Sequence, residues 1–141
     1  MISIKKQMIG CVLCSAFIVC SQNEESTEDC QQVINRINDS VSVQLNYKNE
    51  ICIENQIKIK FEGPIKDSQC PQDVTCMWAG DGSVKIKFMK EIEINYHNLH
   101  TTLSPREIVY GGFKIKLDRL SPHAISTKLI KQEEYKIDLV I

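Results

Sequence analysis

Residues 67–82 read Asp-Ser-Gln-Cys-Pro-Gln-Asp-Val-Thr-Cys-Met-Trp-Ala-Gly-Asp-Gly. This stretch holds two of the seven cysteines, the only tryptophan and two of the six glycines. Pro71 favours an extended or turning path just after Cys70, and a bond from Cys70 to Cys76 would close a short loop. In the chain-entropy account, such a loop adds roughly 2 to 2.5 kcal/mol to stability. The stretch therefore predicts a loop that a disulfide closes.

Trp78 follows Cys76 by two positions, so in extended backbone both side chains point to the same side. The ring could then cover the disulfide and fill one end of a core, which is the expected use of a large side chain in a small domain. The alternative is that Trp78 is an exposed anchor for a partner, presented on a rigid loop.

The same stretch carries a family resemblance. Asp67-Ser68-Gln69-Cys70-Pro71, Val74, Cys76 and Trp78-Ala79-Gly80 resemble the Asp-Ser-Arg-Cys-Pro, Val, Cys, Trp-Ala-Gly signature of small, mostly uncharacterised bacterial β domains that are secreted or lipid-anchored. Tyr110-Gly111-Gly112-Phe113, Leu117, Ser121-Pro122 and Tyr135 are similar to the C-terminal half of that family. The resemblance covers about residues 51–141 and implies a β fold with a disulfide but no particular reaction. Gln69 stands where arginine is usual.

Length and charge narrow the class of protein. The 141 residues suit one domain with a modest core, and 17 basic residues nearly balance 18 acidic ones. No basic stripe indicates a nucleic-acid partner, and no phosphate-binding loop or other cofactor motif is present. We therefore expect a soluble domain that needs no cofactor.

The N-terminus has the order of a bacterial lipoprotein signal. Lys5 and Lys6 precede an uncharged apolar run that ends at Cys20, and residues 21–29 are polar and acidic. We predict a signal peptide over residues 1–19, lipid on Cys20 that anchors the chain to a membrane, a polar tether over 20–29 and a single domain over 30–141. Secretion with ordinary cleavage and an uncleaved apolar helix are the alternatives.

Cysteine counting agrees with export to an oxidising compartment. Loss of residues 1–19 and lipid on Cys20 would leave an even number of cysteines, which allows three pairings. We favour two bridges: Cys70 with Cys76, and Cys30 with Cys52.

Alternating apolar and polar residues predict an all-β fold, a single antiparallel sandwich or barrel of about seven strands. The clear strands span residues 41–47, 57–61, 84–88, 92–96, 113–117 and 135–141, and weaker candidates span 51–53 and 99–103. For Ile92 and Ile94 to face the core with Phe88, residues 89–91 must form a three-residue loop that sets Lys87 opposite Glu93. Otherwise the two strands belong to different sheets.

The histidines are the main candidates for chemistry. His97, His100 and His123 could serve a small periplasmic hydrolase or a metal site, with Cys70 or Cys76 as a conceivable nucleophile. His97 and His100 would point to opposite faces of a strand, and an exported pair of cysteines is expected to be oxidised. The sequence therefore predicts neither catalytic residues nor metal ligands, and no enzyme.

A binding role fits the sequence better. A clamped loop on a β scaffold loses little entropy on docking. We expect its surface residues Gln72, Asp73, Trp78 and Asp81 to contact an envelope protein or glycan. The prediction is an exported, lipid-anchored interaction or accessory module of the bacterial cell envelope.

Overall fold

The structure, a computed structural model, describes residues 33–34, 39–54 and 56–141. The predicted signal peptide (1–19), the predicted lipid attachment at Cys20, the predicted tether (20–29) and Cys30 lie outside the described residues.

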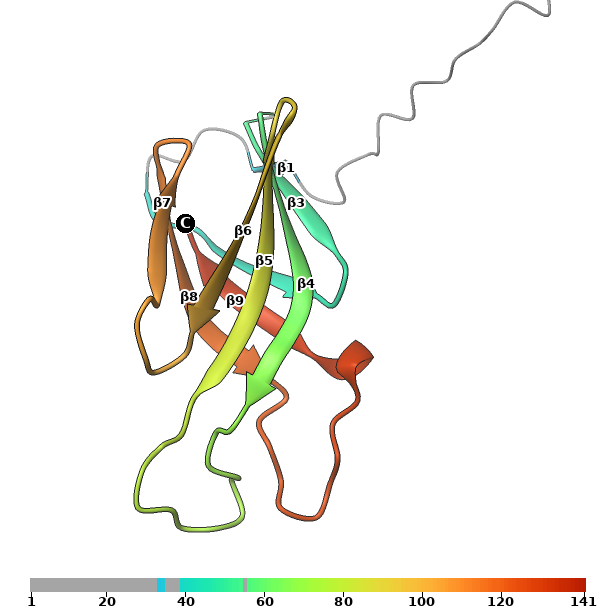
Figure 1. The fold of residues 1–141 in the computed structure, drawn as a ribbon, viewed down its shortest axis with the longest axis vertical. Helices are drawn as coiled ribbons and strands as arrows, with labels where there is room; N and C mark the ends of the chain where they lie inside the picture. Colours follow the sequence, from blue (N-terminus) through green and yellow to red (C-terminus); the bar gives the residue numbers. More distant parts are fainter. Residues whose placement is uncertain (1–32, 35–38, 55) are drawn as a thin grey trace, which may run out of the picture.

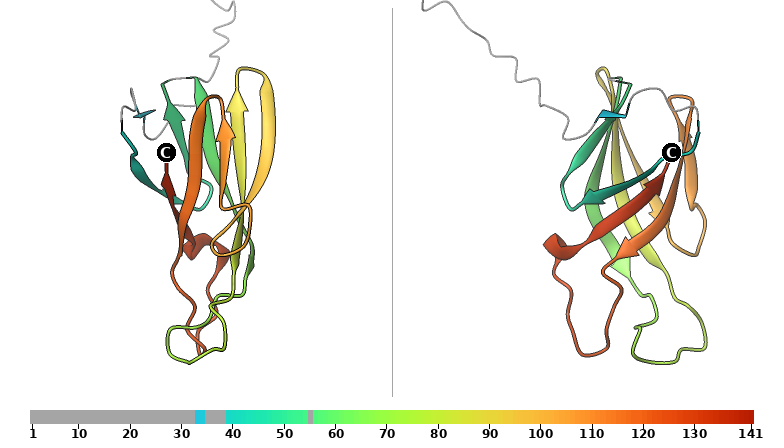
Figure 2. Two further views of the ribbon diagram at one scale, coloured as in Figure 1. Left: turned by 90° about the vertical axis from the view of Figure 1, so that its left-hand side faces the viewer. Right: turned by 180° about the vertical axis from the view of Figure 1, so that it is seen from behind.

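Two β-sheets pack face to face as a sandwich (Figures 1 and 2). One sheet has five strands, in the order β1 (Val33–Ile34), β3 (Glu50–Ile53), β4 (Ile57–Asp67), β5 (Gly82–Lys90) and β6 (Glu93–His100). The other has four, in the order β2 (Ser42–Asn46), β9 (Lys136–Val140), β8 (Phe113–Ser121) and β7 (Glu107–Tyr110). All neighbouring strands are antiparallel except β1 and β3, which are parallel. This architecture confirms the predicted all-β sandwich.

The core lies between the sheets and follows the predicted alternation. Phe61 and Phe88 are fully buried from the five-stranded sheet, and Leu117 and Ile137 meet them from the other sheet. Burial of each such side chain stabilises the fold by about 1.5 to 3 kcal/mol. The rows of apolar side chains therefore determine which face of each strand points into the core. Tyr110 packs its ring on Phe88 with centroids 4.9 Å apart and closes one side of the sandwich.

The predicted strands are present, with corrections at residues 99–104 and at β7. Residues 51–53 form part of β3, as expected. Leu99 belongs to β6, and residues 101–104 form bends rather than a strand. Strand β7 was missed because only four residues form it and Glu107 and Val109 are exposed, which leaves little apolar pattern. A 3-10 turn, η1 (Gln132–Glu134), precedes β9.

The β5–β6 connection differs from the expectation. Lys90 pairs with Glu93, so the turn contains only two residues, Glu91 and Ile92. Glu91 supplies the positive φ of 53° that such a tight turn needs. Lys87 consequently lies opposite Tyr96 rather than Glu93, and the two strands share one sheet, which excludes the different-sheet alternative.

This shorter turn reverses the predicted faces of β6. Asn95 lies opposite the buried Phe88, so Asn95 rather than Ile94 points inward. Ile92, Ile94 and Tyr96 are exposed on the outer face. The prediction that they join the core is wrong because a change of one residue in a turn moves every side chain to the other face.

Two long loops extend from one end of the sandwich. The first joins β4 to β5, and the second joins β8 to β9 (Figure 1). Residues 68–81 make up the first, here called the disulfide loop, and residues 122–131 make up the second, here called the bracing loop.

Candidate partner-binding loops

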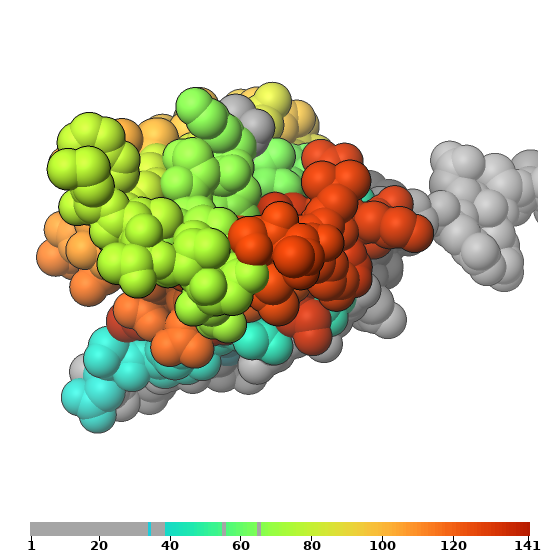
Figure 3. Space-filling model, turned by 90° about the horizontal axis from the view of Figure 1, so that it is seen from below, coloured from blue at the N-terminus to red at the C-terminus, as the bar shows by residue number. Residues whose placement is uncertain are grey.

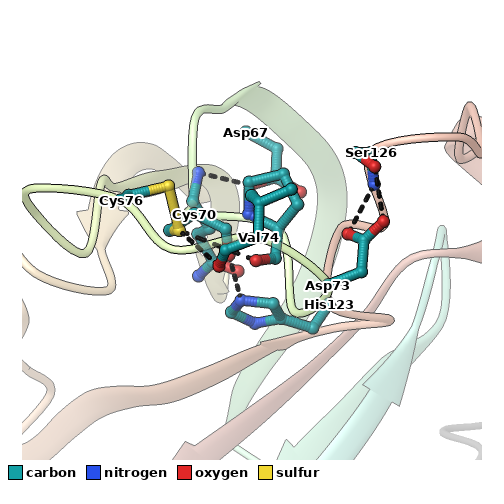
Figure 4. Close-up of a disulfide and its surroundings, with 9 residues drawn as sticks. Asp67, Cys70, Asp73, Val74, Cys76, His123 and Ser126 are labelled. Atoms are coloured by element: carbon teal, nitrogen blue, oxygen red, sulfur yellow. Dashed lines mark hydrogen bonds between the residues drawn. A yellow bond between two sulfur atoms is a disulfide. The ribbon is translucent and has the colours of Figure 1, made fainter.

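The disulfide loop is closed at its neck by a covalent bond and by backbone hydrogen bonds. Cys70 and Cys76 form the predicted disulfide, with Cα atoms 6.0 Å apart (Figure 4). The Cys70 N–H donates to the Ala79 carbonyl at 2.8 Å, and the Ser68 N–H donates to the Asp81 carbonyl at 2.8 Å. The loop therefore starts and ends as a ladder that continues β4 and β5.

Gly80 is required at this neck. Its φ is +72°, and a Cβ atom there would lie 1.9 Å from the Ser68 carbonyl oxygen. Only glycine accepts both this conformation and this close approach. Gly80, which follows Trp78-Ala79 in the sequence, is therefore needed for the loop to adopt this structure.

The bracing loop packs along the disulfide loop. The Gln72 N–H donates to the Ala124 carbonyl at 2.9 Å, and the Asp73 carboxylate accepts hydrogen bonds from the Ser126 N–H, at 2.8 Å, and from the Ser126 hydroxyl (Figure 4). Nε2 of His123 lies 2.7 Å from the Cys70 carbonyl oxygen. Because a carbonyl only accepts, this nitrogen carries the proton and donates. The view of Figure 3 shows the two loops side by side.

Asp81 ties the disulfide loop to a third segment. Its carboxylate lies 2.7 Å from Nδ1 of His100 and accepts the N–H groups of Thr102 and Leu103 at 3.0 and 3.2 Å. Burial raises the pKa of the Asp81 carboxyl, but the hydrogen bonds from His100 and the two amides outweigh burial and hold it below its ordinary value. Asp81 therefore orders residues 101–103.

These contacts change the roles expected for two predicted binding residues. The carboxylates of Asp73 and Asp81 are used within the protein, the first by the bracing loop and the second by His100 and two amides. Gln72 is exposed, and only its backbone N–H is engaged by the bracing loop. The predicted contact residues thus split into a pair that shapes the loop and a pair, Gln72 and Trp78, that is open to solvent.

Trp78 is 81% exposed, so the expectation that its ring fills one end of the core is wrong, and its exposure agrees with the alternative of an exposed side chain. Met77 beside it is 97% exposed, and Val74 is also exposed. The bracing loop adds Ile125 and Leu129, the latter 90% exposed. Large apolar side chains therefore gather on two neighbouring loops, and we call these five residues the apolar tip.

Met77, Ile125 and Leu129 are not among the binding residues that the sequence predicts. The sequence does contain a hint of the exposure of Ile125 and Leu129. They lie in a segment that follows Ser121-Pro122 and lacks the alternation of apolar and polar residues expected of a half-buried strand. What the sequence did not carry is the pairing of residues 72–73 with 124–126, which are more than 50 positions apart.

The three histidines are kept apart by different partners. His97 packs its ring on Phe88, His100 contacts Asp81, and His123 contacts the Cys70 carbonyl. Within residues 33–34, 39–54 and 56–141, no group of three or more His, Cys, Asp or Glu side chains could hold a metal ion. Cys70 and Cys76 are oxidised and provide no thiolate nucleophile.

Cys52 is also disulfide-bonded. The partner predicted for it, Cys30, lies outside the described residues. A buried, oxidised Cys52 is the use expected of a structural cysteine.

A hollow of 460 Å³ lies away from the apolar tip, where the end of β9 meets the β7–β8 hairpin. Its charged lining includes an ion pair, Lys114 with Glu107 at 2.9 Å. The residues that line it are Asp39, Ser40, Glu107, Gly112, Phe113, Lys114, Lys116, Val140 and Ile141.

No protein-family model, curated protein or solved structure matches this chain. The resemblance of residues 51–141 to secreted bacterial β domains therefore stays a prediction. In the part of the chain that the structure describes, no helix is long and apolar enough to cross a membrane.

Proposed function

We propose that the protein is an exported, lipid-anchored module of the bacterial cell envelope that binds a partner through its apolar tip and catalyses no reaction. The observation that carries the binding role is the exposure of Trp78 and Met77 on a loop whose backbone is held by a disulfide and by two other segments.

The rigidity of the loop favours binding. A free loop of this length would lose conformational entropy when a partner docks, whereas the disulfide, the bracing loop and Asp81 have already ordered this one. Exposed tryptophan and methionine side chains are among those enriched at the centres of protein interfaces. Folding does not explain their position, since neither side chain contributes to the core.

Export is supported by the chemistry of the cysteines. Cys52, Cys70 and Cys76 are all disulfide-bonded, which suits an oxidising compartment. The sequence before residue 30 supplies a lipoprotein-like signal with Cys20 at its end. The two features agree on a location outside the cytoplasm.

The partner is an envelope protein or a glycan. An apolar groove on a protein would accept the tip as a whole, whereas a glycan would stack on the Trp78 ring. Met77, Ile125 and Leu129 are aliphatic or thioether side chains, so the composition of the tip favours a protein.

A second candidate function rests on His100. Nδ1 of His100 lies 2.7 Å from the Asp81 carboxylate, the arrangement that orients a general base in hydrolases. A hydrolase would lose its activity in His100→Gln and keep it in Trp78→Ala. The binding function predicts the opposite dependence, with partner capture lost in Trp78→Ala and kept in His100→Gln.

Site-specific photocrosslinking in cells tests the binding function. A photoreactive residue in place of Met77 should give one dominant adduct, and Trp78→Ala in the same chain should reduce it at least tenfold. The same residue in place of Val109, which is 74% exposed on β7, is the matched control and should not give that adduct. Sensitivity of the adduct to glycosidases separates a glycan from a protein. Equal labelling at both positions, or no adduct at Met77, would remove the apolar tip as a binding site.

A further inference from the structure

Strand β6 forms one edge of the five-stranded sheet, and the direction of its backbone groups can be read from the hydrogen bonds at its end. The Thr101 N–H donates to the Gly82 carbonyl, on the β5 side, whereas the His100 N–H donates to the Pro105 carbonyl, on the opposite side. In an antiparallel pair the groups of alternate residues point in opposite directions. The N–H and C=O groups of Ile94, Tyr96 and Asn98 therefore point away from β5.

This edge is uncovered along most of its length. Pro105 covers the edge at His100, and within the described residues no backbone hydrogen bond joins Ile94, Tyr96 or Asn98 to another segment. The pairing of β5 with β6 runs without a bulge from Ser83–His100 to Lys90–Glu93. An edge without a bulge and with free donors and acceptors is a template for another strand.

Most of the devices that block such pairing are missing from β6. Proteins usually protect an edge with proline, lysine, a bulge or an inward-pointing charge, and residues 93–100 contain only the last of these, Glu93 at the start of the strand. Ile94 and Tyr96 are each 53% exposed on the outer face, and Ile92 beside them is exposed as well. The backbone and the side chains of the same strand are thus both suited to a contact.

We propose that β6 pairs antiparallel with β6 of a second copy of this chain, which joins the two five-stranded sheets into one. The strand is complementary to itself when Asn95 lies opposite Asn95 of the second copy. Ile94 then faces Tyr96 of the second copy, and each such pair exchanges both backbone hydrogen bonds. Aliphatic side chains beside aromatic ones are favourable cross-strand neighbours.

The inner face agrees with this register. Glu93 falls opposite His97 of the second copy, where its carboxylate accepts from the ring N–H. The register centred on Tyr96 is less favourable, because Ile94 would face Asn98 and the carboxylate of Glu93 would face Leu99. This dimer uses a different surface from the apolar tip and leaves it free.

Disulfide trapping of the full chain in cells tests both the contact and its register. At the central pair the Cα atoms should be about 4.5 Å apart, within the range that a disulfide bridges. Asn95→Cys should therefore give a covalent dimer on mild oxidation. Tyr96→Cys should not, since its partner position is Ile94, and Val109→Cys on the edge strand of the other sheet should not either. Trapping at Tyr96 or Val109 but not at Asn95 would overturn the proposal.

Sedimentation of the full chain in detergent gives an independent readout. Wild type should sediment as a dimer and Tyr96→Pro as a monomer, because proline removes an N–H that points away from β5 and leaves the β5–β6 bonds in place. Ile94→Lys should also be monomeric, and Val109→Lys should remain dimeric. An unchanged circular dichroism spectrum verifies that each variant is folded. Monomeric wild type, or dimeric Tyr96→Pro and Ile94→Lys, would refute the pairing.

Discussion

Replacing Cys70 and Cys76 together by alanine removes the covalent closure of the disulfide loop and leaves no free thiol behind. The two residues are six positions apart, and in the chain-entropy account a closure of this length stabilises by about 2.2 kcal/mol at 25 °C. The hydrogen bonds that Gln72 and Asp73 make to the bracing loop stay available in the variant. The loss should therefore act mainly through the greater freedom of the unfolded chain.

Thermal and urea unfolding measure this loss. For a domain of about 100 residues, 2 kcal/mol corresponds to a decrease in Tm of about 10 °C. Met77→Ala is the control within the same loop, and it should unfold like wild type because its side chain is almost fully exposed. A double alanine variant that melts within a degree of wild type would show that the disulfide does not clamp the loop.

Three further predictions concern the residues around the loops. Gly80→Ala should lower the free energy of unfolding in urea by about 3 kcal/mol or more, because the added Cβ would lie 1.9 Å from a carbonyl oxygen. Gly112→Ala is the control and should cost about 1 kcal/mol, since Gly112 has a positive φ but nothing lies within 4 Å of its added Cβ. Equal losses in the two variants would refute the steric argument. Because the pKa of Asp81 is lowered in the folded protein, the stabilisation from its carboxylate is complete above about pH 4 and is lost as the pH falls through the folded pKa. Asp81→Asn should therefore be about 1 kcal/mol less stable than wild type at pH 7, and its free energy of unfolding should decrease less on acidification. An acid-unfolding profile identical to that of wild type would contradict this. Burial and the nearby Asp67 raise the pKa of Tyr135 to about 12. Ultraviolet titration should therefore show a tyrosinate that forms near pH 12 and is missing in Tyr135→Phe. The stability that the neutral phenol gives below about pH 10 should be lost as the pH rises through 12.

Much of the fold was predictable because the apolar alternation is strong. Residues 57–61 and 84–88 alternate without interruption, and their apolar members are all buried in β4 and β5. The disulfide was predictable from two cysteines close together around Pro71. These patterns involve residues close together in the chain, so a single sequence is enough to detect them.

The failures arise where one residue decides a long-range outcome. The β5–β6 turn lacks glycine, and Glu91 takes a positive φ, which is uncommon for a residue of this type and is not predicted from the sequence. The sequence therefore suggested a longer turn, and Ile94 and Tyr96 were assigned to the wrong face. Apolar side chains on an outer face are better explained by a contact with another chain than by the core of this one.

The candidate site was predictable as a loop but not as a surface. Trp78 looked like a core residue because large aromatic side chains are normally buried in small domains. Its exposure depends on how the neck at Gly80 and the bracing loop direct the chain, and those contacts join residues far apart in sequence. Asp73 and Asp81 looked like binding residues because nothing in the sequence identifies Ser126 or His100 as their partners.

The intact mass of the protein from its native membrane, alkylated with and without prior reduction, tests the central claim that this is an exported, lipid-anchored chain with structural cysteines. We expect a chain that begins at Cys20, carries lipid there, and reacts at Cys30, Cys52, Cys70 and Cys76 only after reduction. A full-length, unlipidated chain that is alkylated at Cys70 and Cys76 without reduction would contradict it, and would return thiolate chemistry to consideration.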